Sequence, residues 1–156
     1  MKSRLFSLVS FCLAAVLFMG CSDEPSTSVS SLSITAKGDG SAVLLSGTEI
    51  VWYNEATSEL KLKNAPEEFT GYWGEISFML DGENLFDAYG IVEDVRSEFF
   101  TSPVVYRDSK GRYFLNDCYP MSEAVASSPD VQAAREARAA SWATFLCQLK
   151  AEKRLK

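Results

Sequence analysis

Residues 128–150 read SPDVQAAREARAASWATFLCQLK, and this stretch decides which architecture we expect for the chain. Ser128 is a favoured N-cap residue, Pro129 suits the first helical position, and Asp130 places an acid in the first turn. No Gly or Pro follows before Lys150. The pattern therefore predicts one long helix.

This predicted helix carries an apolar stripe with a period of about 3.6 residues. Its members are Val131, Arg135, Ala139, Trp142, Leu146 and Leu149, broadened by Ala143 and Phe145. A helix with such a stripe has to pack against another element, and the preceding chain offers only strands. We therefore expect the helix to lie across one face of a sheet.

The chain before the helix alternates short apolar–polar runs with turn residues, which is the pattern of half-buried strands. The expected strands are residues 32–37, 42–45, 49–53, 59–63, 75–81, 85–92, 103–107 and 112–115. Turn chemistry at residues 54–58, 81–84 and 108–111 predicts hairpins. The fold expected is α+β, a mainly antiparallel sheet with one long C-terminal helix packed on one face.

The N-terminus has the parts of a signal peptide. Lys2 and Arg4 precede an apolar run from Leu5 to Met19, which is short for a membrane-spanning helix. The junction Leu17-Phe18-Met19-Gly20-Cys21 resembles the signals of bacterial lipoprotein precursors, with Phe18 and Met19 departing from the usual residues of that pattern. The resemblance implies removal of residues 1–20 and lipidation of Cys21. An ordinary secretion signal and an uncleaved anchor are the alternatives.

Residues 21–31 follow as a polar, Ser-rich tether, and residues 32–156 form the single globular domain expected. The lipid implied at Cys21 would anchor the protein to a membrane of the cell envelope. We expect an outer-membrane lipoprotein. The acidic pair Asp23-Glu24 resembles the export tags of some surface lipoproteins, and a solvated linker is the other interpretation, so periplasmic and surface-facing locations both stay open.

The charge of the chain disfavours some classes of partner. The full sequence has 15 basic and 21 acidic residues, and loss of Lys2 and Arg4 leaves 13 against 21, a net charge of −8. Nucleic acids and anionic lipid surfaces attract basic patches, so we expect no nucleic-acid partner.

Two cysteines remain once Cys12 leaves with the signal and Cys21 carries lipid. Cys118 and Cys147 could form a disulfide in an oxidising compartment, closing a loop of about 30 residues, or could stay as two buried thiols.

Catalytic chemistry has few candidate residues here. The chain contains no histidine, which removes imidazole-dependent catalysis and imidazole-containing zinc sites. We expect neither a metal nor a cofactor. An acidic run could supply a carboxylate pair for glycan hydrolysis or oxygen ligands for Ca²⁺, but a solvated acidic face is the simpler interpretation. Its members are Asp81, Glu83, Asp87, Glu93, Asp94 and Glu98.

A loop at residues 64–74 contains Phe69, Tyr72 and Trp73, and it predicts either a ligand-binding loop or a cap on the sheet core. We therefore expect a lipid-anchored, non-catalytic binding module whose partner is a glycan or an envelope protein. The alternatives are a small carboxylate-dependent glycan hydrolase and a structural subunit of an outer-membrane assembly.

Overall fold

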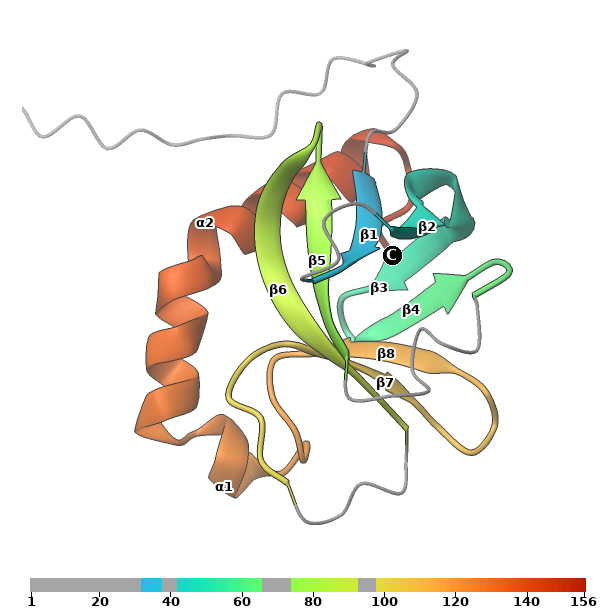
Figure 1. Ribbon diagram of the computed structural model, residues 1–156. Coiled ribbons are helices and arrows are strands. Elements are labelled where there is room, and N and C mark those ends of the chain that lie inside the picture. The colour runs from blue at the N-terminus through green and yellow to red at the C-terminus, as the bar shows by residue number, and fades with distance from the viewer. Residues whose placement is uncertain (1–31, 38–41, 66–73, 93–97) are drawn as a thin grey trace, which may run out of the picture.

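The computed structural model describes residues 32–37, 42–65, 74–92 and 98–156 (Figure 1). The predicted signal, Cys21 and the tether lie outside these residues. The strands are β1 Leu32–Ala36, β2 Val43–Ser46, β3 Ile50–Asn54, β4 Glu59–Leu62, β5 Gly74–Leu80, β6 Glu83–Val92, β7 Val104–Arg107 and β8 Tyr113–Asn116. A 3₁₀ turn η1 (Gly47–Glu49), a short helix α1 (Glu123–Ala126) and the long helix α2 (Pro129–Ala151) complete the described elements.

The hairpins form where turn chemistry predicted them. Asp81 and Gly82 make the two-residue loop between β5 and β6, with φ of 53° and 82°. Positive φ at both positions is the requirement of the turn type whose twist matches that of paired strands. In the β3–β4 connection, the Asn54 carboxamide oxygen accepts hydrogen bonds from the backbone N–H groups of Ala56 and Thr57. The eight predicted strands are confirmed within a few residues at their ends.

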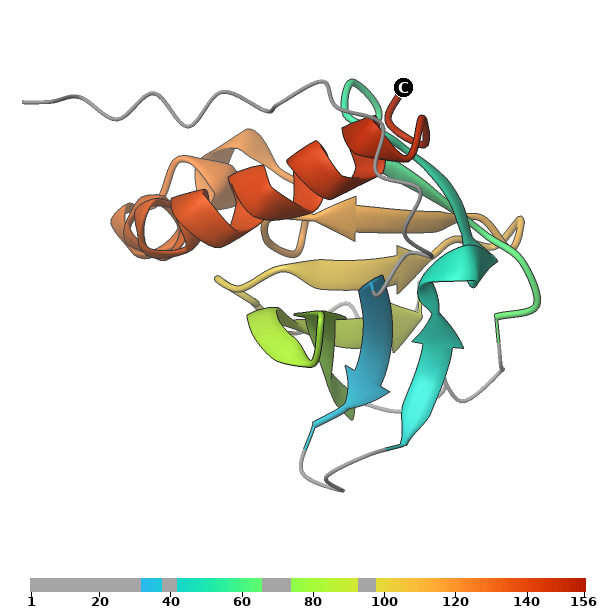
Figure 2. The ribbon, with the colours of Figure 1, turned by 90° about the horizontal axis from the view of Figure 1, so that it is seen from above.

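All eight strands belong to one sheet in the order β2-β1-β5-β6-β7-β8-β4-β3. The pair β6–β7 is parallel and the other pairs are antiparallel, so the sheet is mixed. Only η1 separates β2 from β3 along the chain, although they occupy opposite edges of the sheet. The sheet therefore curls until its edges approach one another, as Figures 1 and 2 show. The predicted α+β class with one long C-terminal helix is confirmed, but the sheet is a near-closed barrel.

Helix α2 begins as predicted, with the Ser128 hydroxyl accepting a hydrogen bond from the Val131 N–H at 3.4 Å. Its buried side chains are Val131, Arg138, Phe145 and Leu149. The predicted stripe was therefore partly wrong. The helix is rotated about its axis, so that Trp142 and Leu146 are half-buried at the side of the core while Ala139 and Ala143 are exposed.

Phe145 joins α2 to the inside of the curled sheet. Its ring centroid lies 5.5 Å from that of Phe78, 5.6 Å from that of Phe86 and 6.0 Å from that of Tyr53. The first two contacts are edge-to-face, the geometry that aromatic quadrupoles favour. Because Phe145 and Leu149 are fully buried, each stabilises the fold by about 1.5–3 kcal/mol.

The chain after α2 returns along the outer edge of β3. The Tyr53 N–H donates to the Arg154 carbonyl at 2.9 Å, and the Lys156 N–H donates to the Tyr53 carbonyl at 2.9 Å. The Arg154 guanidinium also donates to the carbonyls of Gly47 and Ile50, the latter at 3.1 Å. The C-terminal residues thus satisfy backbone groups of an edge strand and tie η1 to the end of the helix.

Candidate functional site

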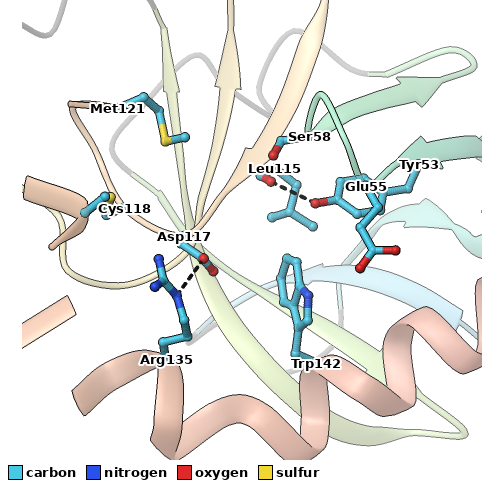
Figure 3. Close-up of a pocket in the computed structure, with 10 residues that line it drawn as sticks. Tyr53, Glu55, Ser58, Leu115, Asp117, Cys118, Met121, Arg135 and Trp142 are labelled. Atoms are coloured by element: carbon cyan, nitrogen blue, oxygen red, sulfur yellow. Dashed lines mark hydrogen bonds and ion pairs between the residues drawn. The ribbon is translucent and has the colours of Figure 1, made fainter. Parts of the chain in front are cut away.

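A cleft lies between α2 and the chain that follows β8 (Figure 3). It consists of two cavities of about 230 and 240 Å³ that share Asp117, Arg135 and Trp142. We call the first the inner cavity, whose other lining residues are Tyr53, Glu55, Ser58, Leu115, Cys118, Met121 and Ala126. We call the second the helix groove, whose other lining residues are Arg138, Ala139, Ala143 and Leu146.

One carboxylate at the end of β8 takes hydrogen bonds from two arginines of α2. Asp117 directly follows β8, and its Oδ2 accepts from the Arg135 Nε at 2.9 Å (Figure 3). Its Oδ1 accepts from the Arg138 Nη2, which also donates to the Asp117 carbonyl at 3.4 Å. The spacing of three residues places both arginines on one face of the helix, above the same acid. The three side chains together carry a net charge of +1.

Arg138 is unusual because its charge lies in the interior. Its side chain is 9% exposed, and its Nη1 is buried without a hydrogen-bond acceptor. A buried donor left without an acceptor costs about 1–3 kcal/mol, and more where the group is charged. Arg138 therefore has an unmet need for an acceptor while it lines the helix groove.

The inner cavity contains groups that stay neutral at physiological pH. Burial raises the pKa of the Cys118 thiol, and the nearby Asp117 carboxylate raises it further. Burial also raises the pKa of Tyr53, against the opposing effect of a hydrogen bond with Ser58. The Tyr53 hydroxyl donates to the Leu115 carbonyl at 3.4 Å (Figure 3). A protonated thiol is a poor nucleophile, so these groups suit hydrogen bonding and packing better than covalent catalysis.

The acidic run proposed for hydrolysis has only one described member that is well enclosed by partners. Asp87 accepts from Ser77 at 2.7 Å and Asn84 at 3.0 Å, and it pairs with Lys37 at 3.0 Å. Burial acts to raise the pKa of Asp87, but these three partners outweigh it and hold the pKa below its ordinary value. A general acid has to be protonated near neutral pH, which this environment disfavours.

The neighbouring carboxylate of Glu75 is held in the same way. It pairs with Lys37 at 2.6 Å and accepts from the Tyr89 hydroxyl at 2.9 Å, and both contacts lower its pKa. Asp87 and Glu75 thus share one ammonium group on the outer surface of the sheet. Glu93 and Asp94, two other members of the run, lie outside the described residues.

Of the two states expected for Cys118 and Cys147, a mutual disulfide or two buried thiols, the structure has neither. Cys118 is a free, buried cysteine, whereas Cys147 is disulfide-bonded. Cys118 lies near Arg135 and Arg138, whose positive charges act to lower the pKa of its thiol. Cys147 is nine residues beyond Arg138, which is about 14 Å along a helix, and a disulfide joins Cα atoms about 4.4–6.8 Å apart.

The other predicted site residues cannot be placed. Phe69, Tyr72 and Trp73 of the aromatic loop fall within residues 66–73, and Cys21 falls within residues 1–31, which are outside the described part of the chain. The cleft itself was not predicted from the sequence, although five of its lining residues had been assigned to the helix stripe: Arg135, Ala139, Trp142, Ala143 and Leu146. Its only signal was Arg138, which lies seven residues from both Val131 and Phe145 and so occupies the buried line of the helix.

Among residues 32–37, 42–65, 74–92 and 98–156, no three metal-ligating side chains converge on a possible metal site. In the same ranges no helix combines the length and the apolar character needed to cross a bilayer. No family model matches the chain, and neither the curated proteins nor the solved structures contain a match.

Proposed function

We propose that the protein is a lipid-anchored binding module of the bacterial cell envelope that holds a small ligand in the cleft beside α2. The observation that carries the proposal is the pair of neighbouring cavities that Asp117, Arg135 and Trp142 line in common. Each is smaller than the 300–1,000 Å³ of cavities that hold drug-sized ligands, so a compact ligand fits best. Apolar walls with a few polar groups are the composition expected of such a site, and the helix groove has this composition.

The protonation states of two sets of groups, one in the inner cavity and one on the outer surface of the sheet, favour binding over catalysis. Cys118 and Tyr53 are held in their neutral forms, while Asp87 and Glu75 are held in their charged forms by Lys37. Glycan hydrolysis by a carboxylate pair requires two neighbouring carboxyl groups, one protonated and one ionised. These environments do not supply that combination, so we do not propose the hydrolase.

Ligand binding is tested by a fragment screen that follows the indole N–H of Trp142 by NMR. We expect compact fragments to shift this resonance and to lose affinity when Ala143 is replaced by Phe, because the larger ring would fill the helix groove. Lys61→Gln is a matched control on the exposed surface of β4. If the fragments that bind shift other resonances and leave that of Trp142 unchanged, the cleft is not the binding site.

The anchor is tested separately by the intact mass of the mature protein from a bacterial host. We expect Cys21 at the new N-terminus with a diacylglycerol on its sulfur and an acyl chain on its nitrogen. The sulfur of Cys21 can carry a thioether-linked lipid or a disulfide, and not both. A mature chain without lipid, or one in which Cys21 forms a disulfide, would refute the anchor and leave the cleft proposal untouched.

A further inference from the structure

We infer that the helix groove binds a small amphipathic organic anion, with its acid group held by Arg138 and Arg135 and its apolar part over Trp142 and Leu146. The inference rests on the proposed binding function and specifies the class of ligand. It depends on three features of the groove, which are its charge, its unsatisfied donor and its apolar wall.

The charge of the groove is positive. Arg135, Arg138 and Asp117 are the ionisable side chains that line it, and they leave one positive charge in excess. The acid Glu55 lines the inner cavity instead. A single carboxylate or similar group on the ligand would therefore neutralise the groove, and this charge balance favours a monoanion over a neutral molecule or a cation.

The N–H donors of the two arginines that Asp117 does not use favour an oxyanion as the ligand. The Arg138 Nη1 is buried without an acceptor in the side chain's present position. Arg135 uses its Nε for Asp117 and its Nη1 for Gln132, the latter at 3.3 Å. Guanidinium groups bind the planar, two-oxygen edge of a carboxylate especially well because their N–H groups form a matching fork.

The remaining wall of the groove defines the rest of the ligand. Ala139, Trp142, Ala143 and Leu146 follow Arg138 along one side of α2 and contribute apolar surface. The eight residue steps from Arg138 to Leu146 span about 12 Å of helix. A ligand with one acid group and a short apolar chain or ring matches that length, whereas a nucleotide or a long polymer segment exceeds the volume of about 240 Å³.

The test uses the mature protein with two probes that differ in charge, sodium octanoate and 1-octanol. We expect octanoate to shift the Trp142 indole resonance at concentrations where octanol has a much smaller effect. Arg138→Met should weaken octanoate binding about ten- to hundred-fold, because it removes a charged hydrogen-bond donor, and should leave octanol binding unchanged. Lys61→Gln, which removes one distant positive charge from β4, should leave both unchanged.

If Arg138→Met does not fold, Arg135→Gln replaces it in the same test, because Arg135 is 42% exposed and tolerates replacement. Equal binding of octanoate and octanol would overturn the anion assignment while the binding function stands. Octanoate binding that survives both arginine variants would also overturn it. If octanoate does not shift the Trp142 resonance at all, the anion assignment is also wrong. The fragment screen described above then tests the binding function independently.

Discussion

Replacement of Asp117 by Asn should destabilise the domain more than any other single loss of charge among the described ion pairs. Asp117 balances the buried guanidinium of Arg138, and asparagine keeps the shape of the side chain but removes its charge. Removing one partner of a buried pair costs about 3–5 kcal/mol because the other charge stays buried without compensation. Asp117 is 32% exposed and Arg138 only 9%, so we expect the lower limit of that range, about 3 kcal/mol.

The effect is measured by urea unfolding followed by circular dichroism. For a domain of this size, a loss of about 3 kcal/mol corresponds to a melting temperature lower by roughly 12 °C. The matched control is Asp108→Asn, because Asp108 pairs at 2.8 Å with Arg112, whose side chain is 51% exposed although that of Asp108 is only 11% exposed. We expect a much smaller change for the control, since water solvates the arginine charge that the substitution leaves behind.

A double-mutant cycle separates loss of charge compensation from general damage. Adding Arg138→Met to Asp117→Asn removes the stranded charge, so the double variant should regain most of the lost stability. The two changes should therefore be strongly non-additive, with a coupling energy of about 2 kcal/mol. If the double variant is as unstable as the sum of the single variants, the electrostatic explanation of this site is refuted.

Three further results are expected. Asp87→Asn should reduce the loss of stability on acidification, because the lowered pKa of Asp87 stabilises the fold above the pKa of the unfolded chain, near 3.8, and this stability is lost as the pH falls through the folded-state pKa. Urea midpoints at pH 7 and pH 3 measure the effect. If the difference between the two midpoints is the same in the variant, the prediction is wrong. Arg154→Ala should cost about 2 kcal/mol in urea unfolding, because it removes charged hydrogen bonds to two carbonyls near β3, and a neutral result would show that water replaces them. Lys153→Gly should increase the free energy of unfolding by about 0.5–1 kcal/mol and so raise the melting temperature slightly, because the φ of 59° at Lys153 favours glycine. A lower free energy of unfolding would contradict that reasoning.

The local elements were predictable because their signals are local. Alternation of side chains, turn residues and a helix cap each depend on fewer than about ten neighbouring residues, and each was confirmed where the structure describes it. The order of the strands was not predictable in this way. It places β2 and β3 at opposite edges although three residues separate them, and it sets β6 parallel to β7. Such pairing depends on contacts between distant parts of the chain, which hairpin patterns do not encode.

The candidate site escaped prediction for a related physical reason. A buried arginine is acceptable only where an acid meets it, and here the acid is 21 residues away, at the end of β8. Judged by residue type alone, Arg138 belongs to the solvated face of the helix. Its seven-residue spacing from Val131 and Phe145 was the one indication that it turns inward, and that indication acquires meaning only when Asp117 is known to lie opposite.

The energetics of Arg138 connect the stability of the domain to its proposed function. A methionine in its position would fill similar volume without a charge and without an unsatisfied N–H, so the fold does not require arginine there. The expected cost of the arginine is offset if the Arg138 guanidinium turns toward an anion in the groove and donates to it, because binding then removes the penalty of the unsatisfied N–H group. The variant with both Asp117→Asn and Arg138→Met should accordingly be folded and close to the original stability, yet weak in binding octanoate. That combination would show that the charged pair serves the ligand rather than the fold.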